Sequence, residues 1–197
     1  MLRQISDSLI SLFFPQSCDI CGQVIETMAD GAACSACWNQ TKLFSETDTL
    51  CAKCGVFLRE SDQPLETFCR RCDDHHYDSA RAVGPYKDAL AATIISLKGS
   101  PSFGKTAAGH LSDAFRRCPF QNSDLIVPVP LSRKRLHSRG FNQATILARI
   151  ISNVAGIPFD EYSFVRTIDT PMHRAAMDQK AREQTVKNAF AVTRPNL

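Results

Sequence analysis

Eight of the nine cysteines form four CxxC pairs in the first 72 residues: Cys18/Cys21, Cys34/Cys37, Cys51/Cys54 and Cys69/Cys72. A CxxC pair places two thiols on one tight turn, and two such turns supply the four thiolates of a structural zinc site. Twelve residues separate the first two pairs and fourteen separate the last two. Both spacings are typical of zinc ribbons. The sequence therefore predicts two structural Zn²⁺ ions bound by eight cysteines.

Other interpretations of the cysteines are open at this point. Disulfides need an oxidising compartment, and no targeting signal directs the chain to one. A redox CxxC is normally a single motif, which four tandem pairs do not resemble. The zinc pairing has two forms, because the first and third pairs could share one ion instead of the first and second. The ninth cysteine, Cys118, is expected to be a buried, inert thiol.

A second group of residues that could bind a ligand lies at 131–141. This stretch carries Arg133, Lys134, Arg135, His137 and Arg139 and has no acidic residue. It follows an unbroken apolar run at 124–130, which predicts a buried strand of a parallel sheet ended by Pro128 and Pro130. Ligands of open α/β sheets bind at the carboxyl ends of strands. We expect a loop that captures an anion, either a phosphate or a nucleic-acid backbone; the alternative is a solvated surface loop.

The remaining elements frame these two groups. Apolar spacing predicts helices at 88–98, 103–115 and 178–188, and a long helix that Asn142 caps and Gly156 ends. Residues 79–86 and 190–192 are expected to be strands, residues 38–44 a short helix, and residues 55–67 a loop with ribbon strands. We expect Trp38 and Phe44 to cover the metal cluster.

Composition indicates an ordinary soluble protein, with 44% hydrophobic and 22% charged residues among 197. Residues 2–14 are too short for a membrane span and predict an amphipathic helix packed on the zinc module, with a membrane anchor as the alternative. We expect a cytoplasmic chain with two domains, 1–77 and 78–197. Residues 73–76, Asp-Asp-His-His, are interpreted as the linker, although they could bind another metal.

Two segments resemble the ComF family: Asp124-Leu-Ile-Val-Pro-Val-Pro-Leu131 and Arg135-Leu-His-Ser-Arg-Gly-Phe-Asn-Gln143, together with the four CxxC pairs. The resemblance implies a double zinc ribbon followed by a type I phosphoribosyltransferase domain, so we expect an α/β fold with a partial parallel sheet. It also implies a role in natural competence and in handling incoming single-stranded DNA, with competence or recombination proteins as partners. The implied phosphoribosyl-pyrophosphate or anion site comprises Pro128, Val129, Pro130, Leu131, Arg133, Lys134, Arg135, Arg139, Gly140, Asn142 and Gln143.

This sequence departs from the family pattern near its end. Two adjacent acidic residues and a Thr-Thr-Gly-Ala-Thr type turn should follow the strand at 190–192, and Leu197 is reached without them. Thr185 stands where asparagine is common, and the glutamine expected near Arg174 is missing. We therefore expect a partial sheet, a tendency to associate and no competent transferase in this chain. Catalytic residues stay unassigned, and Mg²⁺ is expected only if the transferase site is completed.

Three functions follow from these observations. The first is a ComF-type protein that acts in DNA uptake. The second is a zinc-stabilised module that binds single-stranded nucleic acid without catalysis. The third is an active phosphoribosyltransferase.

Overall fold

The structure, a computed structural model, describes residues 15–25, 27–60, 67–72, 76–170 and 179–195. The chain divides into two units by internal contacts. Unit 1 contains residues 1–96 and 102–121, and unit 2 contains residues 97–101 and 122–197. Two helices that follow residue 77 in the sequence therefore belong to the same unit as the cysteine pairs. The domain boundary expected after residue 77 stays a prediction.

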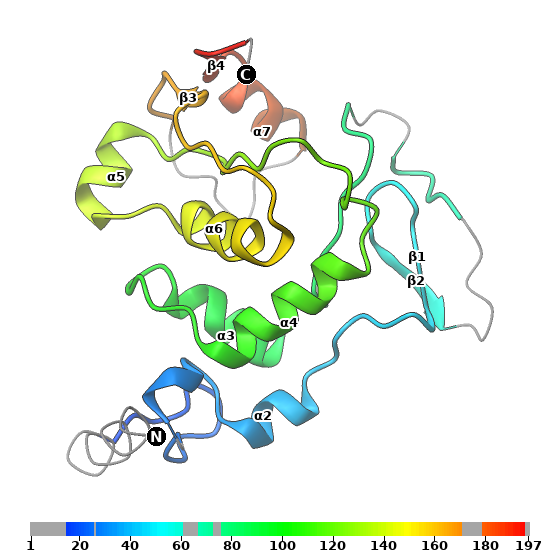
Figure 1. Ribbon diagram of the computed structural model, residues 1–197, viewed down its shortest axis with the longest axis vertical. Coiled ribbons are helices and arrows are strands. Elements are labelled where there is room, and N and C mark those ends of the chain that lie inside the picture. Colours follow the sequence, from blue (N-terminus) through cyan, green and yellow to red (C-terminus); the bar gives the residue numbers. More distant parts are fainter. Residues whose placement is uncertain (1–14, 26, 61–66, 73–75, 171–178, 196–197) are drawn as a thin grey trace. The chain divides into compact units, whose positions relative to one another are not determined.

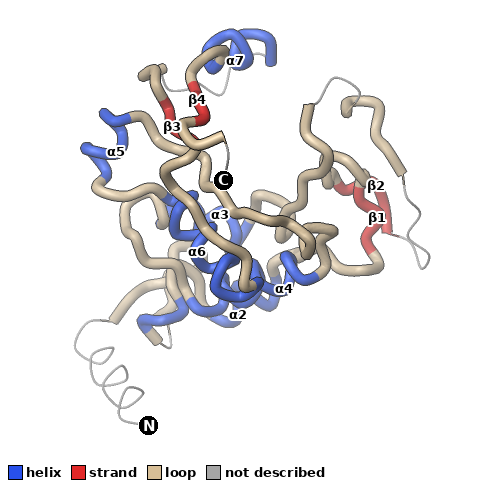
Figure 2. The backbone as a smooth tube through the Cα atoms, turned by 45° about the horizontal axis from the view of Figure 1, so that its top comes forward, coloured by secondary structure: helices blue, strands red, loops and turns tan. Residues whose placement is uncertain are grey.

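Unit 1 is built from short elements around the cysteines. They are the 3-10 helix η1 (Met28–Asp30), helices α2 (Ser35–Gln40), α3 (Asp88–Ser96) and α4 (Lys105–Arg116), and strands β1 (Asp48–Leu50) and β2 (Phe57–Glu60) (Figure 1). Strands β1 and β2 form an antiparallel pair in which Thr49 is opposite Arg59 (Figure 2). The predicted helices at 88–98 and 103–115 are confirmed. The helix expected at 38–44 begins and ends earlier, as α2.

The core of unit 1 includes two of the metal-ligating cysteines. Cys18 and Cys34 are buried together with Trp38 of α2, Ala89 of α3 and Ala107 of α4. The hydroxyl of Thr41 accepts a hydrogen bond from the Ala89 N–H (3.2 Å) and donates one to the Cys37 carbonyl (2.8 Å). The first turn of α3 is therefore tied directly to a cysteine turn. A Cβ at Gly104 would collide with the backbone at Asp30, so α4 can begin this close to η1 only with glycine there.

Unit 2 contains helices α5 (Arg133–Arg139), α6 (Gln143–Ala155) and α7 (Gln179–Val186), and strands β3 (Phe164–Arg166) and β4 (Phe190–Val192). Helix α6 has the predicted caps: Asn142 accepts a hydrogen bond from the Ala144 N–H, and Gly156 adopts the left-handed conformation. Strands β3 and β4 pair antiparallel (Figure 2). The ring of Phe164 stacks on that of Phe190, with centroids 5.1 Å apart. The strand predicted at 190–192 is confirmed as β4.

The predicted parallel sheet is not seen among the described residues of unit 2. In the apolar run at 124–130 only Ile126 pairs, through one parallel bridge to Phe159. Pro128 and Pro130 have no N–H to donate, and no second strand lies along this run within the described residues. Val127 and Val129 are consequently 37% and 60% exposed. The run is an extended segment with one partner, and the fold is a mixed helix and strand region.

Two further expectations are corrected. Residues 131–141 are not a loop, because Ser132 caps α5 and Gly140 ends it in the left-handed conformation. Residues 79–86 form no strand, since their backbone pairs at separate points with the ribbon loops: the Ala80 N–H donates to the Lys53 carbonyl, and the Phe44 N–H donates to the Val83 carbonyl. The predicted N-terminal helix, most of the 73–76 linker and the Asp178 cap lie outside the described residues.

Candidate metal centres and anion-binding cavities

The cysteines form two groups of four. Cys18, Cys21, Cys34 and Cys37 make the first cluster, and Cys51, Cys54, Cys69 and Cys72 make the second; within each cluster all four sulfurs lie within 4.8 Å of one another. Consecutive pairs therefore share a site. The interleaved pairing is excluded.

The sulfur separations fit tetrahedral zinc. A Zn–S bond of about 2.3 Å in a tetrahedron places two sulfurs about 3.8 Å apart. The Sγ–Sγ distances of Cys18–Cys37, Cys21–Cys34 and Cys54–Cys69 are all 3.7 Å, and those of Cys51–Cys72 and Cys69–Cys72 are 3.5 Å and 3.2 Å. A disulfide requires about 2.05 Å, and all eight thiols are free. The two tetracysteine clusters have the donor set and spacing of two structural zinc sites.

Backbone donors prepare one thiol of each cluster for ionisation. The Cys34 N–H points at the Cys18 sulfur (3.4 Å), and the Cys69 N–H points at the Cys51 sulfur (3.2 Å). Burial opposes ionisation of both thiols, but backbone hydrogen bonds outweigh burial and lower the pKa of Cys18 and of Cys51 to about 6. N–H···S bonds of this kind orient the ligands and stabilise the thiolate form that Zn²⁺ binds.

One other thiol of each cluster resists ionisation unless a cation is bound. Burial, and then hydrogen bonds and repulsion from neighbouring thiolates, raise the pKa of Cys37 to about 12 and raise that of Cys72 as well. Four thiolates converge stably only around a positive ion, so each cluster is a site for a divalent cation rather than for isolated reactive thiols.

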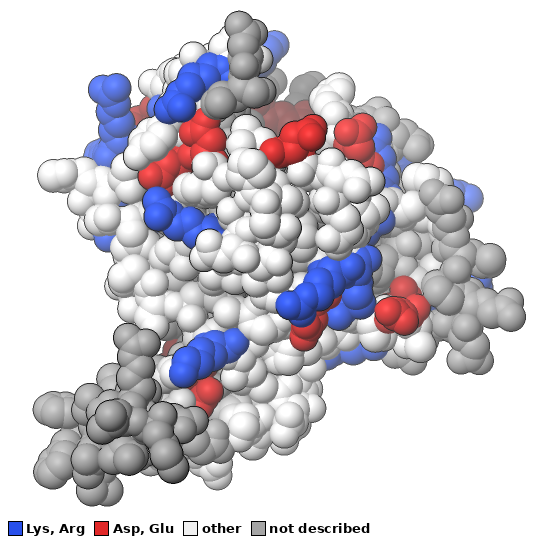
Figure 3. Space-filling view, in the orientation of Figure 1, with Lys and Arg blue, Asp and Glu red and all other residues white. Residues whose placement is uncertain are grey.

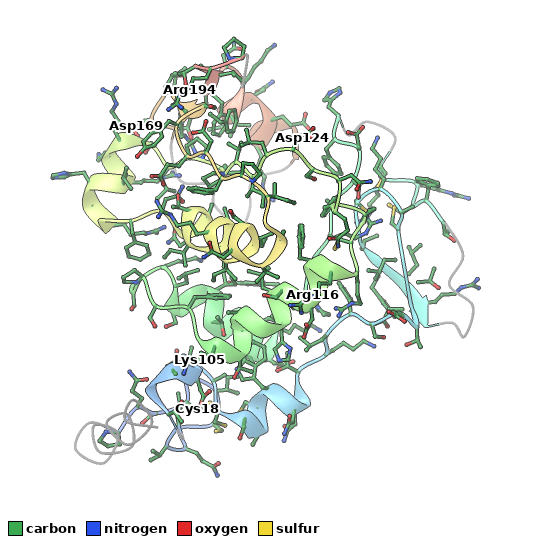
Figure 4. All side chains as sticks on the ribbon, in the orientation of Figure 1. Cys18, Lys105, Arg116, Asp124, Asp169 and Arg194 are labelled. Carbon is green, nitrogen blue, oxygen red and sulfur yellow. The ribbon has the colours of Figure 1, made fainter. Side chains whose placement is uncertain are left out.

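The two clusters lie in different surroundings. The first belongs to the core of unit 1, where Trp38 is 4% exposed and its ring lies 5.0 Å from that of His110; the sulfur of Cys18 is visible in Figure 4. The second is joined to the β1–β2 pair, since Cys51 follows β1 directly and bridges to Thr67. Phe44 stacks on Phe57 of β2, so Trp38 covers the first cluster whereas Phe44 packs on the hairpin.

In unit 2, helix α5 carries the predicted basic residues. Arg133, Lys134 and Arg135 begin the helix and Arg139 ends it, and Figure 4 shows nitrogen-tipped side chains extending away from α5. The Arg135 guanidinium donates to the Thr170 carbonyl (3.0 Å), which holds it against the segment after β3. Among the described residues, no carboxylate forms an ion pair with any of these four cations.

Three of these cations line one cavity. It measures about 890 Å³, and Lys134, Arg135 and Arg139 line it together with Lys98, Gly99 and Asp169. Four cations and a single carboxylate make this cavity strongly positive, which suits an anionic ligand. Lys98 was not among the predicted site residues. No local pattern connects it with α5, because the two meet only through the tertiary fold of unit 2.

A second cavity of about 920 Å³ lies beside the first, and Leu131, Ser132 and Asp169 line both. Its other walls include the aromatic rings of Phe141, Tyr162 and Phe164 and the guanidinium of Arg166. This cavity therefore combines an apolar, aromatic lining with polar and charged side chains, as is common in sites for small organic ligands.

The predicted site residues divide between these cavities. Pro128, Pro130, Leu131, Arg133 and Asn142 line the aromatic cavity. The Val129 carbonyl accepts a hydrogen bond from the Asn142 amide (3.0 Å). Gly140 terminates α5, and Gln143 begins α6 with its side-chain nitrogen buried. Their assignment to a ligand stays a prediction.

Two further observations bear on the sequence expectations. Cys118, which was expected to be buried, is only half-buried. Burial nevertheless raises the pKa of its thiol against the influence of Arg81 and Arg117, and its sulfur donates to the Ala114 carbonyl. Within the described part of the chain, every helix is too short or too polar to cross a bilayer.

Comparison with known proteins assigns the N-terminal part. Residues 9–73 match the model of the double zinc ribbon domain. Competence protein F of Haemophilus influenzae is 29% identical over 173 residues, which cover 84% of this chain and 72% of that protein. The DNA utilization protein YhgH of Escherichia coli is 28% identical over 193 residues, covering 93% of this chain and 81% of that protein.

Competence protein ComFC of Bacillus subtilis is 27% identical over 139 residues, covering 66% of this chain and 55% of that protein. No solved structure matches the chain. The similarity to the first two relatives extends through both units, and the cysteine clusters have the geometry that the matched domain requires. This chain is therefore similar over most of its length to competence and DNA utilization proteins of the ComF type, and its N-terminal part carries a double zinc ribbon.

Proposed function

We propose that this protein acts in the uptake or use of DNA, in the manner of ComF proteins. The names of its relatives, competence protein F and DNA utilization protein, support a role of this kind. Such work requires contact with a polyanion. The net charge of +3 is too small to indicate where such contact occurs, and the face drawn in Figure 3 carries basic and acidic side chains side by side.

The cavity at α5 is the surface that suits this contact best. Lys98, Lys134, Arg135 and Arg139 line it, and Arg133 lies on the same helix. The observation that carries the proposal is that no carboxylate pairs with the α5 cations among the described residues. Unpaired cations bind phosphates without first breaking an ion pair, and they release counterions from a nucleic acid. We infer that this cavity binds phosphate groups of single-stranded DNA.

The second candidate ligand is phosphoribosyl pyrophosphate. The Val-Pro-Val-Pro and Arg-Gly-Phe-Asn-Gln segments support descent of unit 2 from a phosphoribosyltransferase domain. A phosphate-binding cavity next to an aromatic one is also suited to a small phosphorylated ligand. Mg²⁺ would be needed to neutralise its pyrophosphate.

The test replaces Arg133, Lys134, Arg135 and Arg139 together by serine in the zinc-loaded chain. Single-stranded DNA binding should weaken, and the slope of log K against log salt should decrease by about 3, because each phosphate contact contributes about 0.7. The matched control replaces four other exposed cations, Lys87, Lys105, Arg182 and Lys187, which lowers the net charge by the same amount.

An equal loss of binding in both variants would reduce the effect to net charge and contradict the assignment. Mg²⁺-dependent binding of phosphoribosyl pyrophosphate that displaces DNA would show that both ligands use one site. Turnover of that ligand would favour the enzyme.

A further inference from the structure

The two zinc ribbons differ in the residues that their cysteine turns expose. A CxxC turn has two residues between its ligands, and these surround the metal because both turns of a cluster face it. In the first cluster they are Asp19-Ile20 and Ser35-Ala36. In the second they are Ala52-Lys53 and Arg70-Arg71. The turns of the second cluster thus carry three cations, whereas those of the first carry one acidic residue and no cation.

These cations are available to a partner. Arg70 and Arg71 are exposed and Lys53 is half-buried. Among the described residues none of the three forms an ion pair with a carboxylate. A cation outside an ion pair gains most from an anion that brings several charges at once.

Charge neutralisation at the metal does not explain the cations. A Zn²⁺ ion with four thiolates carries a formal charge of about −2, and nearby cations reduce its self-energy. The first cluster would carry the same charge, however, and it has Asp19 at its turn. A ribbon of this chain therefore folds without basic turn residues, and the cations of the second ribbon are left without a structural reason.

Exposed aromatic rings accompany the cations. Phe68 immediately precedes Cys69 and is 62% exposed, and Tyr77, five residues after Cys72, is 40% exposed. The Ala80 N–H, three residues after Tyr77, donates to the Lys53 carbonyl, so this segment runs beside a turn of the second cluster. Phe57 of β2 is also 40% exposed. An exposed ring of this kind offers a face on which an unpaired base can stack.

We propose that the second zinc ribbon is a contact site for single-stranded nucleic acid. Its cations, Lys53, Arg70 and Arg71, bind phosphates, and Phe68 and Tyr77 stack on unpaired bases. Cations interleaved with aromatic rings are the combination that binds single strands without reading sequence, because every base has a π-face. The turns of the first ribbon hold Asp19 and no cation, so they offer no comparable phosphate contact. This site lies in unit 1 and is additional to the α5 cavity, and it rests on the proposed function in DNA uptake or use.

The test compares full-length, zinc-loaded variants on a labelled oligothymidine. Arg70→Ser/Arg71→Ser should lower the salt slope by about 1.4, since each lost contact removes about 0.7. Phe68→Ala should weaken binding by about five-fold or more, the loss expected for one stacked base, and should leave duplex binding unchanged because paired bases are not free to stack. The matched control Lys87→Ser/Lys105→Ser removes the same charge from unit 1, and Lys105 is labelled in Figure 4.

A second measurement depends on position rather than affinity. An oligonucleotide containing 5-iodouracil, irradiated in complex with the wild-type chain, should crosslink to Phe68 or Tyr77, as identified by mass spectrometry. Each variant must retain two Zn²⁺ per chain, so that loss of binding is not loss of folding.

The outcomes separate this site from the proposed function. Suppose that the wild-type protein binds DNA. If the α5 variant then loses binding and the Arg70/Arg71 variant behaves like its control, the ribbon site is overturned and the α5 site stands. If the ribbon variants alone lose binding, the ribbon site stands and the α5 assignment falls. Crosslinks confined to unit 2 overturn the proposal. If the ribbon variants keep the DNA affinity of the wild type but lose binding of a protein partner, the proposal is overturned as well. If the wild-type chain does not bind DNA, both the ribbon site and the α5 site are overturned.

Discussion

Single hydrogen-bonded side chains hold the ends of the short elements together. Asp160 is a clear case: it is 8% exposed and accepts hydrogen bonds from the Ser163 hydroxyl and from the N–H groups of Tyr162 and Ser163. Arg194, just beyond β4, lies 3.7 Å from the same carboxylate. One ionised group therefore joins the segment before β3 to the segment after β4.

The stability of unit 2 should depend on the charge of Asp160. Hydrogen bonds from the Ser163 hydroxyl and the Tyr162 N–H outweigh burial and lower the pKa of Asp160 below its ordinary 3.8. Its contribution is fully present above the unfolded pKa of about 4 and is lost as pH falls through the folded pKa. In urea titrations, Asp160→Asn should lower stability at pH 6, and the difference from wild type should shrink below pH 4.

Asp169→Asn is the matched control for that titration, because Asp169 is exposed and has no ion pair among the described residues. A constant difference between wild type and Asp160→Asn from pH 6 to pH 3 would show that the carboxylate charge is not what matters.

At the scale of elements, capping determines where the cations of α5 lie. Seven residues make a helix that is marginal by itself, and the Ser132 hydroxyl accepts the Arg135 N–H at its start. The aligned cations exist as a surface only while this short helix is formed.

Removal of that cap should weaken ligand binding without removing charge. Ser132→Ala should destabilise α5 by about 1 kcal/mol, and it should lower single-stranded DNA affinity because the helix frays. Ser132→Asn keeps a capping oxygen and should retain affinity. Equal affinity of the alanine variant and wild type, measured by fluorescence anisotropy, would contradict a role for the helical arrangement.

The two zinc ribbons should respond differently to loss of one ligand. Cys34 is packed with Trp38, Ala89 and Ala107, so Cys34→Ala should expose the core shared by α2, α3 and α4. Cys51→Ala should disrupt mainly the β1–β2 pair, because Cys51 directly follows β1. Native mass spectrometry should find two Zn²⁺ in wild type and one in each variant, and hydrogen exchange should show protection of α3 lost only in Cys34→Ala. Loss of both ions from either variant would show that the ribbons are not independent.

For the molecule as a whole, local chemistry was predictable and long-range pairing was not. The cysteine spacing predicted both clusters, and Asn142 and Gly156 predicted the ends of α6, because ligand turns and helix caps depend on residues a few positions apart. The apolar run at 124–130 predicted a central strand, but a strand needs a partner, and only Ile126 has one. Lys98 joined the α5 cavity through tertiary contacts that no local pattern encodes.

The division into two units predicts separable responses to metal removal. The chain passes between units after residues 96, 101 and 121, and both tetracysteine clusters lie in unit 1. Structural zinc supplies much of the folding free energy of a ribbon, so chelation should unfold the elements whose core contains the ligands. Unit 2 has its own buried residues, among them Ala148 of α6 and Ala189 before β4, and no cysteine cluster among its described residues. Hydrogen exchange with a chelator should therefore show α3 and α4 losing protection while α6 keeps it, and added Zn²⁺ should restore the first two. Simultaneous loss of protection in α6 would instead show that the two units fold as one cooperative structure.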